Sequence, residues 1–192
     1  IRIGQSVTLT GRCITKHMAS KVNEIIAGKY DHQGESIIYG DTDSVYFSAH
    51  KPLTKEIESG QIQWSKESVI ALYDKIAEEM NTTFTSFMTK AFHCPSTRGS
   101  IIKAGRELVA IKGLFITKKR YALLYYDIEG TRTDNAGKEG KMKAMGLDLK
   151  RSDTPIFVQN FLSDILLMVL TGKTEKQVLD RIGEFRSEFK AR

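Results

Sequence analysis

The sequence predicts an α+β fold in which an antiparallel sheet is backed by helices and followed by a purely helical segment. Within residues 37–47, two runs rich in β-branched and aromatic residues flank a short polar tip, which is typical of a β-hairpin. Apolar residues recur at three- and four-residue steps over residues 7–27 and 65–92, which favours two long helices. Strand-like runs fill residues 101–128, whereas only helical patterns follow residue 152, where a domain boundary is expected.

The first predicted helix, residues 7–27, ends before Gly28, a residue common at helix C-termini. Its apolar positions are Val7, Leu9, Cys13, Ile14, Met18, Val22, Ile25 and Ile26. In the predicted hairpin, residues 40–43 supply the turn chemistry between the two strands. A loop is expected over residues 48–64.

The second long helix is expected to run from Ser65, as its N-cap, to Phe92. Its threonine-rich middle, residues 82–85, is a weak helix former and predicts a break or kink. Further strands are expected over residues 101–104, 108–116 and 120–128, and a polar, glycine-rich hairpin or loop over residues 129–140.

Two helices are predicted in the C-terminal segment. Thr154 as N-cap and Pro155 at the first helical position predict the start of a very apolar helix over residues 156–170. Thr174 and Gln177 have the spacing of a capping box, which predicts a last, amphipathic helix.

The composition is that of an ordinary folded domain. Of the 192 residues, 41% are hydrophobic and 27% are charged, and no apolar run reaches the length of a membrane span. Cys13 and Cys94 form neither a disulfide framework nor a zinc motif, so we expect buried or partly buried thiols in a reducing compartment. A start at Ile1 instead of Met predicts a piece of a longer protein.

The net charge of +6 is concentrated in one stretch. Between Arg98 and Arg151 there are 13 Lys and Arg against 6 Asp and Glu, whereas the remainder of the chain has 16 against 17. A localised excess of positive charge is typical of a surface that binds a polyanion such as nucleic acid, although a soluble surface can have the same pattern.

The two carboxylates at the predicted hairpin tip are candidates for a metal site. Residues i and i+2 of an extended chain point to the same side, so Asp41 and Asp43 would lie about 6–7 Å apart. Their repulsion, about 2–3 kcal/mol at an effective dielectric near 20, favours a cation such as Mg²⁺. A solvated acidic turn is the alternative. An EF-hand is excluded, because Val45 and Tyr46 stand where that motif requires an oxygen ligand and a glycine.

The string Tyr-Gly-Asp-Thr-Asp-Ser at residues 39–44 resembles the third polymerase motif of family B DNA polymerases. Lys119 and Tyr121 are similar to the Lys-x-Tyr element of that family, and residues 141–147 resemble its Lys-x-Lys-x-x-Gly-Leu segment. The resemblance covers nearly the whole chain in order and is closest to the T4-like phage branch. It implies the C-terminal part of a polymerase palm at residues 1–151 and the beginning of an all-α thumb at residues 152–192.

The resemblance also implies an activity: template-directed transfer of dNTPs to a primer 3′-hydroxyl by two-metal catalysis, with two Mg²⁺ ions that Mn²⁺ can replace. Asp43 would be the direct metal ligand and Asp41 a neighbouring carboxylate, and Glu107 is carried over as a further metal-site carboxylate. Tyr39 and Thr42 would contact the nucleotide. The residues expected to hold primer–template DNA are Lys118, Lys119, Arg120, Tyr121, Lys141 and Lys143.

Several alternatives stay open. Glu107 could be an exposed strand charge paired with Arg106, and the basic run at residues 118–120 could be solvated. The first and second polymerase motifs have no counterpart in the sequence, so the chain alone is expected to be inactive. A non-catalytic primer–template duplex-binding subunit of a split polymerase is therefore the alternative function. Unrelated palm-like enzymes, such as reverse transcriptases and cyclases, have different acidic signatures.

The expected partners follow from the same resemblance. They are primer–template DNA, dNTPs, the remaining polymerase domains or an upstream subunit, and a sliding clamp, with no membrane. The expected location is the cytoplasm, which would be the host cytoplasm for a phage protein.

Overall fold

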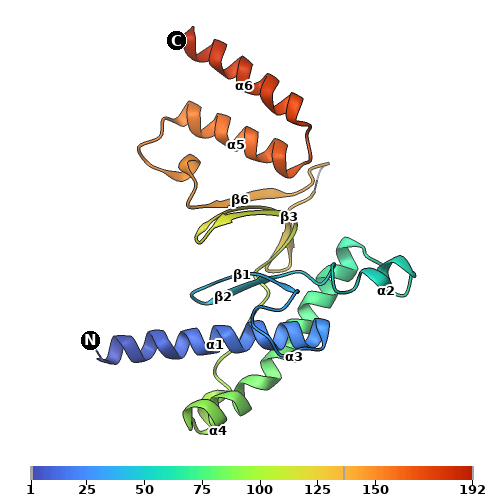
Figure 1. Cartoon of the computed structure of the whole chain (residues 1–192), viewed down its shortest axis with the longest axis vertical. Helices are drawn as coiled ribbons and strands as arrows, with labels where there is room; N and C mark the ends of the chain where they lie inside the picture. Colours follow the sequence, from blue (N-terminus) through green and yellow to red (C-terminus); the bar gives the residue numbers. More distant parts are fainter. Residues whose placement is uncertain (1, 136, 192) are drawn as a thin grey trace. The chain divides into compact units, whose positions relative to one another are not determined.

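A computed structural model describes residues 2–135 and 137–191 and shows an α+β fold, as predicted (Figure 1). The chain divides into two compact units, the first ending at Arg106 and the second beginning at Glu107. The predicted palm–thumb boundary at residues 151 and 152 lies inside the second unit and stays a prediction.

The first unit combines two long helices with a short hairpin. Its elements are α1 (Arg2–Ala27), β1 (Ile37–Asp41), β2 (Ser44–Phe47), α2 (Thr54–Glu58), α3 (Lys66–Phe92) and α4 (Ser96–Gly99). Ser65 caps α3 as predicted, because its hydroxyl accepts a hydrogen bond from the backbone N–H of Ser68. The loop expected over residues 48–64 contains the short helix α2, which the sequence analysis missed.

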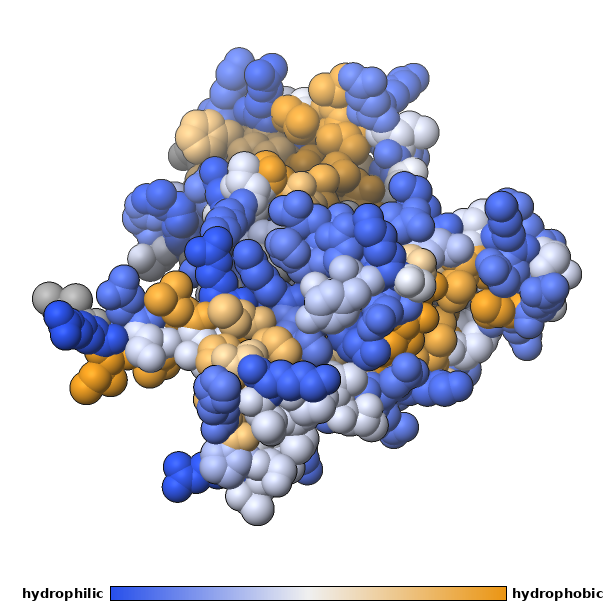
Figure 2. Space-filling model, turned by 60° about the horizontal axis from the view of Figure 1, so that its bottom comes forward, coloured by the Kyte–Doolittle hydropathy of each residue, from blue (hydrophilic) through white to orange (hydrophobic). Residues whose placement is uncertain are grey.

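The helix α1 begins earlier than predicted, and its first half is exposed. Val7 and Leu9 are 68% and 53% exposed and Cys13 is exposed as well, so the packing expected for these three residues is wrong. The buried residues of α1 all lie between His17 and Asn23, the part of the helix that packs most closely within the first unit. Figure 2 shows hydrophobic patches on one face of the molecule, between larger hydrophilic areas.

The helix α3 is continuous through its threonine-rich middle, so the predicted break is wrong. The hydroxyls of Thr82 and Thr83 donate to carbonyl oxygens three residues earlier, at Glu79 and Met80. The following residue, Phe84, is only 1% exposed. Burial and internal hydrogen bonding therefore override the weak intrinsic propensity.

His17 joins α1 to α3. Its ring is stacked on Phe87 with a centroid distance of 3.9 Å, Nδ1 lies 2.8 Å from the Tyr30 hydroxyl, and Nε2 lies 3.0 Å from Thr83 Oγ1. The Thr83 hydroxyl gives its proton to the Met80 carbonyl, so its oxygen accepts from Nε2–H. In the neutral imidazole, Nε2 therefore carries the proton and Nδ1 accepts a hydrogen bond from the Tyr30 hydroxyl.

This arrangement predicts a pH dependence of stability. Burial, reinforced by the nearby Lys21, lowers the pKa of His17 below its ordinary value of 6.5. As the pH falls below 6.5, the unfolded chain binds a proton that the folded state resists, so the free energy of unfolding decreases. We expect the urea midpoint to fall between pH 7.5 and pH 5.5, and to fall less in His17→Gln. Equal falls in both proteins would assign the effect to other groups.

The second unit is an antiparallel sheet covered by a helix. Its strands are β3 (Leu108–Thr117), β4 (Arg120–Ile128), β5 (Thr131–Arg132) and β6 (Lys141–Met145), followed by the 3-10 helix η1 (Asp148–Lys150), α5 (Ile156–Leu170) and α6 (Glu175–Lys190). On one side β4 pairs with β3, and it also pairs with β5 and β6. The expected strand at residues 101–104 is absent, because the Asn81 side chain on α3 binds both the N–H and the carbonyl of Ala104.

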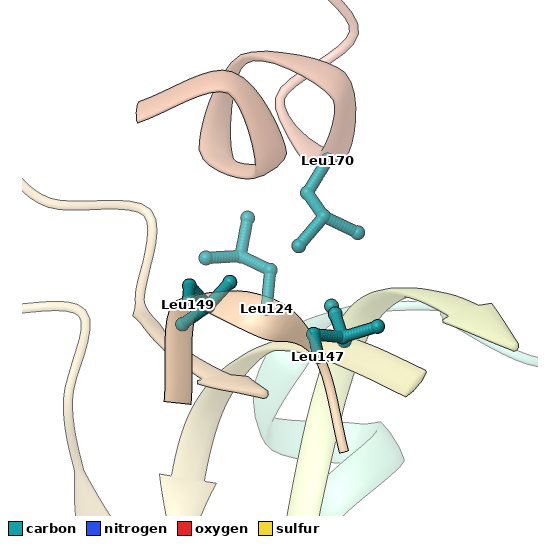
Figure 3. Close-up of a cluster of buried hydrophobic side chains, with 5 residues drawn as sticks. Leu124, Leu147, Leu149 and Leu170 are labelled. Carbon is teal, nitrogen blue, oxygen red and sulfur yellow. The ribbon is translucent and has the colours of Figure 1, made fainter. Parts of the chain in front are cut away.

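The core of the second unit lies between the sheet and α5 (Figure 3). Ala122 and Leu124 on β4 are 0% and 1% exposed, and they meet Leu147, Leu149 and Leu170. Each fully buried leucine of this kind stabilises the fold by about 1.5–3 kcal/mol relative to an exposed one. The sheet is therefore packed on α5 through the face that carries Ala122 and Leu124.

The starts of α5 and α6 differ in how well they were predicted. Pro155, not Thr154, is the N-cap of α5, and the Thr154 hydroxyl donates instead to the Asp148 carbonyl at 3.0 Å. The capping box of Thr174 and Gln177 at α6 is present as predicted.

Candidate catalytic hairpin and nucleic-acid interface

The acidic hairpin is anchored on α1 through a buried amide. Asn23 is 1% exposed, and its Nδ2 donates to the Lys29 carbonyl at 2.8 Å, while its Oδ1 accepts from the Ser36 N–H at 3.1 Å. Gly34 passes so close that a Cβ there would lie 2.1 Å from the Asn23 side chain. These contacts fix the connection that enters β1 from α1.

The hairpin register places the two aspartates differently. Asp41 is opposite Ser44 at the end of β1, whereas Asp43 lies in the two-residue turn with Thr42. Thr42 has φ 37°, so the extended spacing assumed for the two carboxylates is wrong at this point. Asp41 is half-buried and Asp43 is exposed.

Side-chain hydrogen bonds stabilise the turn at the tip of the hairpin. The Thr42 hydroxyl donates to Asp41 Oδ1 at 3.1 Å, and the Ser44 hydroxyl donates to the Asp41 carbonyl at 3.2 Å. The Thr15 hydroxyl on α1 reaches the Thr42 carbonyl at 2.8 Å, a contact that the sequence analysis missed. Tyr39 packs against Tyr46 with 5.8 Å between ring centroids. Nucleotide contacts by Tyr39 and Thr42 stay predictions.

The donor set of the hairpin fits part of a magnesium site. Hard carboxylate oxygens are the ligands that Mg²⁺ prefers, and it commonly takes one or two of them together with substrate phosphates. Asp41 and Asp43 supply two carboxylates, but residues 2–135 and 137–191 contain no group of three side chains able to hold a metal ion. Additional ligands are therefore required beyond the hairpin.

Glu107 is placed in the second unit, directly before β3. Its carboxylate pairs with Lys143 Nζ at 2.5 Å, and the two side chains are 51% and 28% exposed. Arg106, the partner considered for Glu107 from the sequence, instead pairs with Asp74. The assignment of Glu107 as a metal ligand stays a prediction.

The register of β4 with β6 sorts the basic and aromatic residues onto one face. Tyr121 is opposite Met145, Leu123 is opposite Lys143, and Tyr125 is opposite Lys141. Directly opposed residues share a face, so both lysines lie on the face of Tyr121, as the i, i+2 spacing predicts. The alternate residues on these strands form the face that packs on α5.

The turn between β3 and β4 presents three exposed cations. Thr117 pairs with Arg120, which leaves Lys118 and Lys119 at the tip, and Lys119 has φ 61°. Tyr121 is only 4% exposed and stacks on Phe115 with a centroid distance of 5.6 Å. Its ring is therefore a support of the basic turn in this structure, and its DNA contact stays a prediction.

The two basic elements are joined by Gly146. Arg120 Nε donates to the Gly146 carbonyl at 3.2 Å, and a Cβ on Gly146 would lie 2.1 Å from the Lys119 carbonyl oxygen. The chain after β6 therefore packs directly on the backbone of the β3–β4 turn. We use the name basic face for the cations of the β3–β4 turn and of β6, which are Lys118, Lys119, Arg120, Lys141 and Lys143; Lys141 and Lys143 lie on the Tyr121 side of the sheet, and Arg120 alternates with Tyr121 along β4.

Comparisons with known proteins show which proteins the chain is similar to. The model of DNA polymerase family B matches residues 1–191. The DNA-directed DNA polymerase of Escherichia phage RB69 is 31% identical over an alignment of 183 residues, gaps included. This match covers 88% of this chain and 19% of that protein. The DNA-directed DNA polymerase of Enterobacteria phage T4 is 26% identical over an alignment of 211 residues, gaps included. This match covers 99% of this chain and 22% of that protein.

A eukaryotic relative matches the same region. The DNA polymerase delta catalytic subunit of Glycine max is 30% identical over 175 residues, 90% of this chain and 13% of that protein. The chain thus spans about a fifth or less of the relatives described here. Within residues 2–135 and 137–191, every helix lacks the length or the hydropathy needed to cross a bilayer. From the match over residues 1–191 we conclude that the chain belongs to DNA polymerase family B.

Proposed function

We propose that this chain is the part of a DNA-directed DNA polymerase that carries the acidic hairpin of the nucleotidyl-transfer site and a primer–template-binding sheet. The observation that carries the proposal is the Tyr-Gly-Asp-Thr-Asp-Ser string, which lies at the end of a two-stranded hairpin in a member of family B. The second unit adds the basic face.

Asp43 is the exposed carboxylate of the hairpin and would hold Mg²⁺ together with Asp41. The chemistry that Mg²⁺ supplies when bound is neutralisation of the charge that develops on the transferred phosphoryl group and the primer oxygen. Asp41 receives a hydrogen bond from Thr42, which orients its carboxylate beside the turn. The protein's contribution is thus a pair of oxygen donors whose backbone is fixed by α1.

The basic face would hold the backbone of the primer–template duplex. Lysine and arginine contacts to phosphates position a protein on DNA without reading its sequence, so no sequence preference is expected. Lys143 is paired with Glu107 in the structure, so a phosphate at this position has to compete with a carboxylate. The contribution of Lys143 to DNA binding is therefore expected to be lower than that of the exposed Lys118.

A non-catalytic duplex-binding subunit of a split polymerase is the second candidate. It is favoured by the placement of the basic turn, because Lys118, Lys119 and Arg120 belong to a compact unit that begins at Glu107 and does not include the acidic hairpin. Both candidates predict DNA binding by the basic face, and they differ in whether the acidic hairpin takes part in synthesis.

Mg²⁺-dependent primer extension separates these candidates. The chain is assayed alone and mixed with the polypeptide encoded immediately upstream, with Asp43→Asn as the paired variant. Extension only in the mixture, lost in Asp43→Asn, supports the proposed polymerase role. Extension in the mixture that Asp43→Asn leaves intact favours the non-catalytic subunit. Extension by the chain alone would contradict both candidates, because each expects the chain to need its upstream partner for synthesis.

A lysine substitution tests the basic face. Lys119→Ala is expected to weaken duplex binding and to reduce the slope of log K against log salt by about 0.9, the value for one lost phosphate contact. Fluorescence anisotropy with a labelled primer–template duplex measures both quantities. The matched control is Lys176→Ala on α6, an exposed lysine outside the basic face. Identical slopes for the two variants would remove Lys119 from the interface.

A further inference from the structure

The hydroxyl of Thr15 connects two segments that are 27 residues apart. It lies 2.8 Å from the Thr42 carbonyl in the hairpin turn and 3.0 Å from the Gly11 carbonyl one helical turn earlier. A threonine hydroxyl has one proton, so the hairpin carbonyl shares it with the ordinary helical acceptor. Thr8 on the same helix bonds to the Gly4 carbonyl at 2.9 Å in the ordinary pattern and provides a comparison.

The conformation of Thr42 needs support from its surroundings. Its φ of 37° is in the left-handed region, which is rare for a β-branched residue. Such conformations cost on the order of 1–3 kcal/mol and persist when neighbouring contacts over-determine them. The hydrogen bond from Thr15 is a contact of this kind from outside the turn.

The bonded carbonyl is directly coupled to Asp43. The Thr42 carbonyl and the Asp43 N–H belong to the same peptide unit, and a peptide unit is planar. Fixing the carbonyl oxygen therefore fixes the plane that carries the nitrogen and Cα of Asp43. The direction in which Asp43 leaves the turn is in this way set by a side chain on α1.

We propose that Thr15 is a positioning residue for the Asp43 carboxylate, a role that rests on the proposed polymerase function. Its hydroxyl holds the left-handed turn in the conformation that presents Asp43 to a metal ion. Without the hydroxyl, the turn samples other conformations, and the carboxylate pair loses preorganisation toward Mg²⁺.

Three variants isolate the hydroxyl. Thr15→Val keeps the shape and the β-branched character of the residue but removes the donor, and Thr15→Ser keeps the donor. Thr8→Val makes the same change on α1 at a residue whose hydroxyl bonds within the helix. Circular dichroism confirms that each variant is folded before comparison.

The first readout is amide hydrogen exchange at Asp43 and Ser44, measured without metal, nucleotide or DNA. We expect Thr15→Val to accelerate exchange about three- to tenfold, the factor that one hydrogen bond is worth, while Thr15→Ser and Thr8→Val stay near the wild type. Equal exchange in Thr15→Val and Thr8→Val would overturn the proposal. So would failure of Thr15→Ser to restore protection, because packing alone would then explain the effect.

The second readout is the Mg²⁺ concentration required for half-maximal primer extension by the chain mixed with its upstream polypeptide. Thr15→Val is expected to raise this Mg²⁺ concentration several-fold at unchanged duplex affinity, and Thr15→Ser is expected to restore the wild-type value. An unchanged Mg²⁺ requirement in Thr15→Val would overturn the positioning role. An inactive wild-type mixture would instead refute the proposed function. In that case the exchange experiment still decides whether Thr15 holds the turn.

Discussion

Asp43→Asn is expected to abolish primer extension in the complete polymerase while leaving duplex binding nearly intact. The substitution keeps the size of the side chain and removes its charge, so the exposed turn can retain its fold. Loss of a group that stabilises transition-state charge typically reduces kcat by about 10²–10³, and a direct metal ligand should reach at least this range. The basic face belongs to the other compact unit and keeps all its charges.

Two assays and one control decide this prediction. Primer extension gives the rate, and anisotropy with a labelled primer–template duplex gives the affinity. Glu35→Gln, which neutralises an exposed carboxylate shortly before β1, controls for the change in net charge. Equal loss of extension and binding in Asp43→Asn would show that Asp43 maintains the fold. Full extension would remove Asp43 from the metal site.

The features predicted correctly are those that local sequence determines. The hairpin at residues 37–47 follows from two β-prone runs around a polar turn, and the N-cap at Ser65 and the capping box at Thr174 are each defined within four residues. The shared face of Lys141 and Lys143 follows from the two-residue period of a strand. None of these features depends on a distant part of the chain.

The features predicted wrongly depend on partners that are distant in sequence. Residues 101–104 have a strand-like pattern, but the amide of Asn81 satisfies the backbone of Ala104 and replaces a neighbouring strand. Val7 has the right periodicity for a buried face, yet the buried residues of α1 begin only at His17. Periodicity indicates which face of a helix can be buried, and tertiary structure decides how much of it is.

The candidate site shows the same division. The acidic string makes Asp41 and Asp43 candidates directly, whereas Thr15 offers no signal, because a threonine in a helix normally bonds to its own backbone. The pairing of Glu107 with Lys143 was also beyond sequence reasoning, since 36 residues separate them. Contacts of this kind become visible only when the strands are in register.

Gly146→Ala is expected to have the largest effect on the basic face. Gly146 has φ 63°, and an added Cβ would lie 2.1 Å from the Lys119 carbonyl oxygen, a backbone atom that cannot rotate away. The left-handed conformation alone costs a non-glycine residue about 1–2 kcal/mol, and the steric overlap adds to this. We therefore expect a lower free energy of unfolding and a separation of the β3–β4 turn from the end of β6.

The matched control is Gly130→Ala in the same sheet. Gly130 has φ 81°, but a Cβ there would meet no atom within 4 Å, so this variant has the conformational cost without the overlap. Urea unfolding and the salt dependence of duplex binding are measured for both. A larger loss of stability and of duplex affinity in Gly146→Ala would show that Lys119 and the lysines of β6 bind DNA as one preorganised surface. Equal effects would show that the turn moves freely, and the two basic elements would then act independently.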